Sequence, residues 1–402
     1  MLTQSQTNAI EIILKGHNVL LTGSPGTGKS YILQYIINKN LHRKLGITAT
    51  TGCAAINING TTIHSFFGLK PNQNIKKHTE ELIKRKNATY KKLYNLEILI
   101  IDEVSMLDNI LCDEISFILK TIKQNEKEFG GIQVIFVGDF FQLPPVSNTF
   151  CFTSNSWINL NPKIVELKEI VRQSNDKLFQ LILAKLRYGN MTKQIYEILE
   201  KNINISFNNS DIKPTILYPN NVDVDLINKK ELDKLKGKSK VFLATYNKKV
   251  NNYLLEKLKD YNILLCVGAQ IMITKNISIE NELINGTRGI IIDIKEASVI
   301  IKTENNIYEI NLYSQDVPND YVKNLKILFM PIKLAYAITI HKSQGATIDY
   351  LSIDIGKKIF SYGQAYTALS RGKSLKNINI ISLDEMAFQA HPIVLKWINQ
   401  HH

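Results

Sequence analysis

Short apolar runs alternate with segments of helical periodicity in the N-terminal part of the chain. Apolar residues recur at helical spacing between residues 3 and 15, which predicts a first helix. Continuous apolar runs predict buried strands at 18–23, 44–51, 96–103 and 131–139. Buried strands separated by helices are typical of an α/β fold with a parallel sheet covered on both faces. Because ligands bind at the carboxyl ends of such strands, we expect functional residues where these runs end.

The pattern changes twice farther along the chain. Residues 69–95 are polar and strongly basic, which indicates a surface excursion rather than a core element. After Pro145 the strand and helix signals restart, with strands predicted at 163–171 and 214–220. Short alternating segments over 269–313 then predict a small antiparallel β module. Mixed patterning returns at Ile332, so the module is expected to be inserted into a second α/β domain.

Composition places the chain among globular proteins. The 402 residues are 44% hydrophobic and 21% charged, which fits two or three domains and excludes a fibrous or disordered chain. No apolar run reaches the roughly 18 residues of a membrane-spanning helix, and the first residues, MLTQSQTNAI, do not resemble a secretory signal. The scattered cysteines are Cys53, Cys112, Cys151 and Cys266. We therefore expect a soluble protein of the cytoplasm or nucleus, in a reducing compartment.

The charge balance gives a first indication of a partner. Lysine and arginine number 49 against 36 acidic residues, for a net charge of +13. Such a balance suits a polyanion, either nucleic acid or an anionic membrane surface. A lysine-rich composition without a specific partner is the alternative at this point.

The most specific motif is GSPGTGKS, between a predicted strand and a predicted helix. It satisfies the G-x-x-x-x-G-K-[ST] pattern of a phosphate-binding loop in the structural context that the pattern requires. Glycines let the backbone wrap a phosphate, and the following helix aims its N–H groups at the anion. Lys29 should reach the β- and γ-phosphates, and Ser30 should be a ligand of Mg²⁺. The loop residues are Gly23, Ser24, Pro25, Gly26, Thr27, Gly28, Lys29 and Ser30.

Two acids end the predicted strand at 96–103. An acid at a strand end beside a phosphate loop can hold Mg²⁺, and a neighbouring carboxylate can orient a water molecule. We assign Asp102 to the metal and Glu103 to the role of general base.

Two glutamines have alternative interpretations. Gln142, in GDFFQLPPV just after the next strand, can sense a γ-phosphate or can be a turn residue packed by prolines. Gln6 lies three residues after Thr3, which matches a capping box and locally favours that interpretation. The alternative for Gln6 is an amide that recognises adenine.

The order of the motifs resembles that of one family. The chain is similar to superfamily-one helicases, and ELKEIVRQS is similar to a signature of the PIF (petite integration frequency) helicases. The resemblance covers nearly the whole chain. It is carried by LTQSQ at the start, GSPGTGKS, TTGCAAININGTTIHSFFG (50–68), IDEVSM (101–106), GDFFQLPPV, ELKEIVRQS, ELINGTRG (282–289), YAITIHKSQGATID (336–349) and QAYTALSRGKS (364–374).

The resemblance implies roles around ATP. Gln6 would read the adenine base, which reverses the local preference for a cap, and Lys29, Ser30, Asp102, Glu103 and Gln142 keep the roles given above. Arg172 and Arg371 would be arginine fingers that stabilise transition-state charge from the second domain. Gln344 and Gly345 would line the nucleotide.

The resemblance also implies contacts to DNA. Phe66 and Phe67 can offer a stacking face to a base, or they can form a core pair under the sheet. The positions that match strand-contacting residues are Thr51, Gly52, His64 and Ser65 in the first domain and Asn285, Arg288, His341, Lys342 and Ser343 in the second. The partners implied are single-stranded DNA and forked duplex DNA, bound by a monomeric core with no membrane partner.

The family organisation implies two RecA-like P-loop domains with parallel sheets. The first would span 1–150, with a wedge subdomain at about 69–95, and the second 151–402, with an SH3-like β subdomain at about 270–330. Since the core begins near Met1, no mitochondrial presequence is expected. The implied activity is 5′-to-3′ translocation and DNA unwinding driven by ATP and Mg²⁺. Alternatives are a RecD-like or transfer-type subunit active only in a complex, and a nucleic-acid-stimulated remodelling ATPase.

Overall fold

In the computed structural model the chain folds into two compact units. The first contains Met1–Ile195, Phe360–Ser370 and Glu385–His402, and the second contains Tyr196–Ile359 and Arg371–Asp384. The structure describes all residues except 1, 41, 71–72, 172–175, 206–211, 251, 276, 279–282, 284–285, 305, 318–321, 323–324 and 402. Among the helices so described, none is both long and apolar enough to cross a lipid bilayer.

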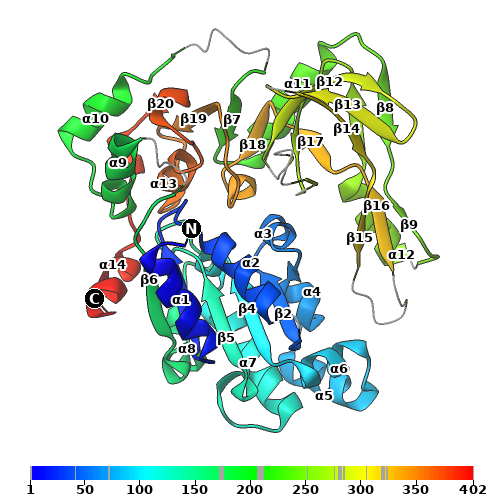
Figure 1. Ribbon diagram of the computed structural model, residues 1–402, viewed down its shortest axis with the longest axis vertical. Coiled ribbons are helices and arrows are strands. Elements are labelled where there is room, and N and C mark those ends of the chain that lie inside the picture. Colours follow the sequence, from blue (N-terminus) through cyan, green and yellow to red (C-terminus); the bar gives the residue numbers. More distant parts are fainter. Residues whose placement is uncertain are drawn as a thin grey trace. The chain divides into compact units, whose positions relative to one another are not determined.

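A six-stranded parallel sheet forms the centre of the first unit (Figure 1). Its strands in spatial order are β3 (Thr61–Thr62), β2 (Leu45–Ala49), β4 (Ile98–Asp102), β5 (Gln133–Val137), β1 (Val19–Gly23) and β6 (Lys163–Leu167). The inner strands β1, β4 and β5 are buried along their whole length, which is why they read as continuous apolar runs. The predicted parallel sheet is confirmed. The predicted domain boundary at residue 150 lies inside this unit, because β6 pairs with β1.

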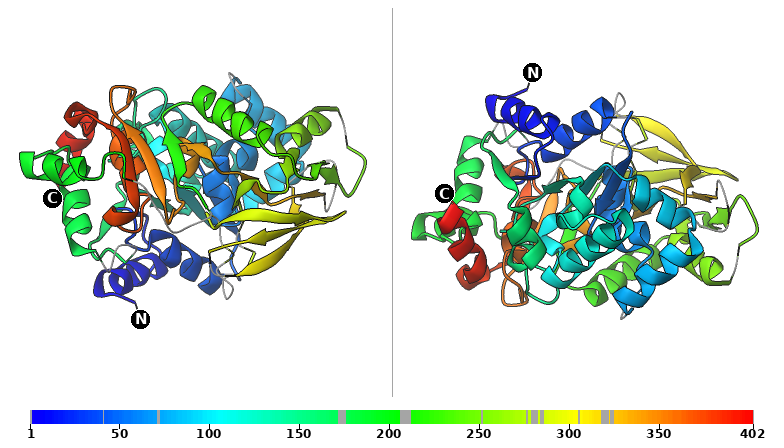
Figure 2. Two further views of the ribbon diagram at one scale, coloured as in Figure 1. Left: turned by 90° about the horizontal axis from the view of Figure 1, so that it is seen from above. Right: turned by 90° about the horizontal axis from the view of Figure 1, so that it is seen from below.

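Helices flank both faces of this sheet (Figure 2). On one face, apolar residues of α1 and α2 pack with those of β1 and β5 in one core cluster. On the other, Trp157 contacts the ring of Phe136. The helices are α1 (Gln4–Leu14), α2 (Lys29–Lys39), α3 (Gly52–Asn57), α4 (Ile63–Phe67), α5 (Ile75–Arg85), α6 (Ala88–Asn95), α7 (Asn109–Lys123), α8 (Asn155–Leu160), α9 (Lys177–Arg187), α13 (Gln364–Leu369) and α14 (Pro392–His401), with α10 (Lys193–Glu200) at the division between the units.

The basic excursion contains the two short helices α5 and α6. Asn74 and Asn87 cap them by accepting hydrogen bonds from the backbone N–H groups of Lys77 and Tyr90. Leu82 and Leu93 are buried, and both helices contact α7. The segment is thus a polar helical pair fastened to the first unit by a few apolar residues. Its assignment as a wedge stays a prediction.

The second unit combines a parallel sheet with antiparallel ones. The parallel sheet has the order β18 (Ala337–Thr339), β7 (Thr215–Tyr218), β19 (Leu351–Ile355) and β20 (Ile378–Leu383). A five-stranded antiparallel sheet has the order β14 (Ile307–Asn311), β13 (Ser298–Lys302), β12 (Arg288–Ile294), β11 (Gln270–Ile273) and β17 (Ile332–Leu334). The antiparallel module predicted over 269–313 is therefore confirmed.

Smaller elements complete the second unit. One antiparallel group contains β15 (Tyr313–Asp316), β16 (Lys326–Phe329) and β9 (Thr245–Tyr246), and a two-stranded pair contains β10 (Ile263–Cys266) and β8 (Ser239–Phe242). The helices are α11 (Asn221–Asp233) and α12 (Asn252–Leu258).

Candidate nucleotide and nucleic-acid sites

The phosphate loop connects β1 to α2 in the first unit. Gly26 and Gly28 have φ angles of 85° and 87°, which glycine adopts without steric cost, and Gly28 is the N-cap of α2. A Cβ atom at Gly23 would lie 2.7 Å from the carbonyl oxygen of Leu167, so close packing against β6 also requires a glycine there. The Lys29 Nζ donates to the carbonyl oxygens of Gly23 at 2.7 Å and Ser24 at 3.1 Å. The loop therefore holds its lysine over its own backbone.

Lys29 is partly buried and lies close to several acids. Burial lowers its pKa to about 8, and the nearby carboxylates of Asp139 and Glu103 oppose that effect. These acids come from the carboxyl ends of β5 and β4, the two strands that follow one another next to β1 in the sheet. The sheet order thus brings Lys29 and the acids of two later motifs together.

Asp102 and Glu103 occupy a turn at the end of β4. Burial, together with the charge of the adjacent Glu103, raises the pKa of Asp102 to about 7. The Asp102 Oδ1 accepts a hydrogen bond of 2.9 Å from the backbone N–H of Glu103. Glu103 has a φ of 53°, a left-handed conformation that is uncommon for glutamate and concentrated at functional sites. The turn gives the two carboxylates different environments.

Gln6 combines the two interpretations given above. The capping box is present, because its Oε1 accepts from the backbone N–H of Thr3 at 3.0 Å and its own N–H donates to the Thr3 hydroxyl. Its side-chain Nε2 also donates to the carbonyl oxygen of Thr27 in the phosphate loop at 3.1 Å. The cap therefore places this amide against the loop, and adenine recognition by Gln6 stays a prediction.

An ion pair that the sequence patterns did not single out lies behind this site. The guanidinium of Arg187 on α9 donates to the Asp139 carboxylate at 3.0 and 3.2 Å and to Glu166 on β6 at 2.8 Å. The Arg187 side chain is 5% exposed and that of Asp139 is fully buried. The Tyr366 hydroxyl on α13 also lies 3.5 Å from Asp139. Through these hydrogen bonds, Arg187 links Asp139, the acid beside Lys29, to Glu166 on β6.

A sequence signal for Arg187 existed. It lies four residues after Leu183, on the buried stripe of α9 that otherwise carries Phe179, Ile182 and Leu186. A charged side chain at such a position must find a buried partner. Gln142, three residues after Asp139, is also buried, and its N–H donates to the Asp139 carbonyl oxygen at 2.9 Å.

The predicted DNA contacts of the first unit fall into two groups. Thr51 and Gly52 follow β2, and Thr51 accepts a hydrogen bond from the N–H of Ala54 in α3. His64 and Ser65 are exposed on α4. Phe66 is different, since it is only 7% exposed.

The alternative of a core pair describes Phe66 and Phe67 better than a stacking face does. Their rings meet edge to face at 5.4 Å, and Phe67 is fully buried. The ammonium of Lys92 lies 4.1 Å from the centroid of the Phe66 ring and covers it. The structure therefore does not support the predicted role of Phe66 in stacking on a base.

In the second unit, Arg288 is buried against protein rather than open to a strand. Its guanidinium donates to the carbonyl oxygen of Lys213 at 2.8 Å and lies over the Tyr350 ring at 5.8 Å. A direct contact of Arg288 with a DNA phosphate is thus not supported by this geometry. Asn285 and Arg172 lie outside the residues that the structure describes.

Five of the remaining predicted residues lie in one turn of the second unit, and Arg371 lies elsewhere in that unit. His341, Lys342 and Ser343 form a 3-10 turn after β18, followed by the buried Gln344 and by Gly345 with a φ of 79°. Burial lowers the pKa of His341, which favours its neutral form. Lys342 is exposed, and Ser343 is buried. Arg371 is also buried, with 2% exposure.

Comparisons with known proteins agree with these motifs. A family model for "PIF1-like helicase" matches residues 1–202, and one for "DNA helicase Pif1, 2B domain" matches 255–294, which overlaps the predicted β module. The chain is 34% identical to the ATP-dependent DNA helicase PIF1 of Danio rerio over 98% of its own length. It is 30% identical to the ATP-dependent DNA helicase Pif1 of Bdellovibrio bacteriovorus over 99% of its own length and 92% of that protein. It spans 63% of the Danio rerio protein.

Solved structures extend the likeness to the fold. The crystal structure of Pif1 helicase from Candida albicans matches with a TM-score of 0.83 at 29% identity, over 100% of both chains. A Bacteroides Pif1 helicase in complex with ADP-AlF3 and single-stranded DNA matches with a TM-score of 0.70 at 27% identity, over 100% of this chain and 97% of that one. The parallel sheets and the antiparallel sheets of the second unit match the architecture of these helicases, with its RecA-like domains.

Proposed function

Because the chain belongs to the PIF1-like helicase family, we propose that it is an ATP-dependent DNA helicase that translocates 5′ to 3′ on single strands and unwinds duplexes. The observation that carries this proposal is the partly buried Lys29 of the phosphate loop, among the carboxylates at the ends of β4 and β5. A partly buried lysine beside acids, on a helix N-terminus, is suited to a polyphosphate that brings its own negative charge. The related Bacteroides structure holds a nucleotide analogue and single-stranded DNA.

The donor set at the loop fits Mg²⁺. In the part of the chain that the structure describes, no three His, Cys, Asp or Glu side chains gather as a metal-binding cluster. Mg²⁺ commonly uses one or two protein oxygens together with phosphates and water. Ser30 and Asp102 would hold it, and there it would neutralise charge on the β- and γ-phosphates. Since the pKa of Asp102 is about 7, a proton and the metal would compete for this carboxylate.

The side chains of the chain then divide the catalytic work. Lys29 would bind the β- and γ-phosphate oxygens, and Glu103 would orient the attacking water and accept its proton. Gln142 would detect the γ-phosphate, while Arg172 and Arg371 would stabilise the charge that develops in the transition state. Gln6, Gln344 and Gly345 would contact the nucleotide.

DNA movement follows from different affinities in the nucleotide states. Residues of each unit would contact single-stranded DNA or the tail of a forked duplex. The protein would bind this DNA as a monomer. The contacting residues are Thr51, Gly52, His64 and Ser65 in the first unit and Asn285, His341, Lys342 and Ser343 in the second. If ATP binding favours one arrangement and hydrolysis releases it, one set of contacts can advance past the other.

The test of this function is ATP turnover of the purified chain with and without a single-stranded oligonucleotide, together with displacement of a labelled strand. We expect DNA to stimulate turnover and a duplex with a 5′ tail to be unwound. Unwinding of only 3′-tailed duplexes would contradict the polarity. Lack of turnover by a folded chain would favour a subunit active only in a complex, and turnover without displacement would favour a remodelling ATPase.

Glu103→Gln should keep nucleotide binding and lose turnover. The amide preserves the size of the side chain, and Ser30 and Asp102 still hold the metal, but the base is gone. General-base contributions are typically about 10²- to 10⁴-fold, so we expect a loss in that range. Steady-state hydrolysis and binding of a fluorescent ATP analogue check it, with the exposed Glu126→Gln as matched control. A turnover rate close to that of the control would remove Glu103 from this role.

A further inference from the structure

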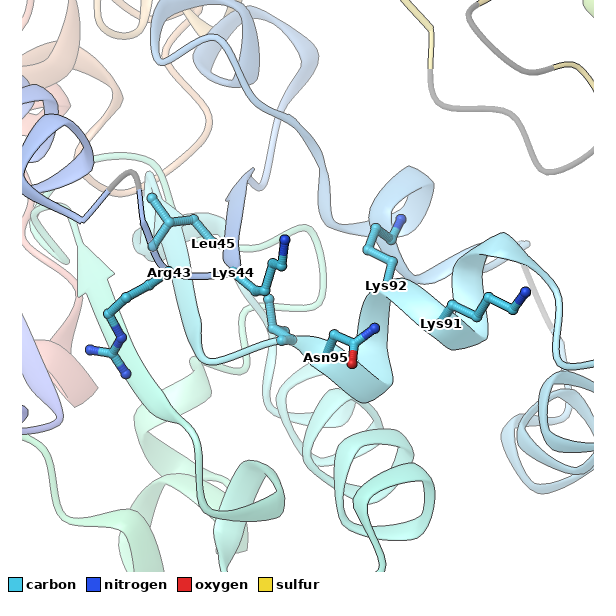
Figure 3. A pocket seen from close by; sticks show the side chains of 7 residues that line it. Arg43, Lys44, Leu45, Lys91, Lys92 and Asn95 are labelled. Carbon is cyan, nitrogen blue, oxygen red and sulfur yellow. The ribbon is translucent and has the colours of Figure 1, made fainter.

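A basic hollow lies in the first unit between the start of β2 and the end of α6. Its volume is about 320 Å³. Figure 3 shows side chains from two separate segments of chain around it, with the amide of Asn95 among the cationic groups. The polar residues that line it are Arg43, Lys44, Lys91, Lys92 and Asn95, above an apolar base made by Leu45 and Leu96.

The positive charge of this hollow is only partly neutralised. Arg43 pairs with Glu97 at 2.9 Å, and both side chains remain partly exposed. Lys44 and Lys91 are both exposed, and neither forms an ion pair with any carboxylate that the structure describes. The carbonyl oxygen of Lys44 accepts from the N–H groups of Glu97 and Ile98, at 2.9 and 3.3 Å, so β4 holds this segment in place. The fold therefore brings several cations together, and among the described carboxylates Glu97 pairs with only one of them, Arg43.

The end of a helix does not account for the whole cluster. Lys92 lies in the last turn of α6, where a cation offsets the helix dipole, whereas Lys91 lies in the middle of that helix. Arg43 and Lys44 lie beyond the last turn of α2, directly before the strand β2. An additional anionic ligand is the simplest reason for cations from two segments to face one hollow.

The hollow is separate from the phosphate loop and has one contact with the helix α4. It lies at the amino end of β2, whereas Thr51 and Gly52 follow the carboxyl end of that strand. Lys92 covers the ring of Phe66 on α4. The same short helix carries the exposed His64 and Ser65. Through Lys92 the hollow thus adjoins α4, the helix that carries two of the predicted strand contacts.

We propose that this hollow binds backbone phosphates of nucleic acid, as a contact region additional to the residues assigned to the single strand. The proposal rests on the proposed DNA helicase function. Lysines on separate segments around an open hollow suit successive phosphates of a strand, because each can contact one phosphate as a point charge. A compact site for one free anion is instead typically built from converging backbone N–H groups, as in the phosphate loop.

The double variant Lys44→Gln with Lys91→Gln tests the proposal. Neither residue pairs with a described acid, so the substitutions break no ion pair that the structure describes. The control, Lys15→Gln with Lys39→Gln, removes the same charge from exposed positions elsewhere in the first unit. Binding of a labelled single strand, a blunt duplex and a fork is measured by fluorescence anisotropy between about 50 and 200 mM salt. Thermal unfolding of each variant checks that it is folded.

We expect the hollow variant to lower the slope of log affinity against log salt by roughly 1.4 to 1.8 relative to the control, because two phosphates are no longer neutralised. Affinity near 0.15 M salt should fall roughly 10- to 30-fold. A change on the single strand alone would assign the hollow to the tail, and a change on duplex and fork alone would assign it to the paired region. Either result supports the proposal.

Two outcomes would overturn it. One is equal salt slopes and affinities for the hollow variant and the control on all three DNAs. The other is unchanged DNA binding with a raised KM for ATP in the absence of DNA, which would assign the hollow to a free phosphate compound. If the wild-type chain binds none of the DNAs, the proposed function itself fails, so the two failures are distinguishable.

Discussion

Lys29→Ala should lower ATP turnover by more than about 10³-fold. Removal of one neutral donor to developing charge already costs about 10²- to 10³-fold, and Lys29 carries a full charge. Its removal also leaves Asp102, Glu103 and Asp139 facing the phosphates without the cation that lies among them. Repulsion between these carboxylates and the nucleotide then adds to the loss.

The matched control for this prediction is Lys39→Ala. Lys39 is exposed in the last turn of the same helix, α2. The control substitution therefore removes the same charge at the end of the helix that is farthest from the loop. Steady-state hydrolysis at saturating ATP and single-strand DNA gives the comparison, and circular dichroism reports folding. A folded Lys29→Ala protein that hydrolyses ATP at the wild-type rate would remove the phosphate loop from the mechanism.

Arg371→Ala should depress turnover by about 10³- to 10⁵-fold, the range for an arginine finger, and Arg172→Ala should do the same. The guanidinium of a finger acts on charge that develops in the transition state, so nucleotide affinity should change much less than kcat. Arg371→Lys should recover little, because an ammonium cannot contact two phosphate oxygens as a planar fork does.

Arg371 is buried, so its loss could also destabilise the second unit. Thermal unfolding of Arg371→Ala, Arg371→Lys and the nearby exposed control Lys373→Ala separates the two effects. Turnover at saturating ATP and the Kd for a nucleotide analogue are measured on the folded variants. A variant that loses nucleotide affinity while kcat stays unchanged identifies its arginine as a binding group instead.

Local sequence was sufficient for the elements that carry the nucleotide chemistry. A strand that is apolar at every position is stable only where both of its faces are buried. The strands β1, β4 and β5 could therefore be predicted from their own residues, without knowledge of their neighbours in the sheet. The glycines and Lys29 of the loop, and the acids after β4, follow from the same runs because each motif lies directly at a strand end. The alternating residues of β11 to β14 likewise predicted a sheet with two different faces.

Tertiary structure alone decided which of these elements meet. The order of β4, β5 and β1 in the sheet brings Asp102 and Asp139 to Lys29, and strand order depends on contacts between residues far apart in the chain. The same holds for Trp397 near the C-terminus, whose ring stacks on that of Phe152. The C-terminal segment Glu385–His402 therefore belongs to the first unit, although it was predicted in the second domain. No local pattern encodes such pairings.

The fate of individual polar and aromatic side chains was decided in the same way. Gln6 is both a cap and a neighbour of the loop, because the cap aims its amide at Thr27. Phe66 is covered by Lys92, a residue of the excursion, and Arg187 is held by Asp139 from another strand. The sequence by itself determined the elements and their motifs, since these depend on periodicity and local geometry. Burial and ion pairing depend on partners that only the folded chain brings within a few ångströms.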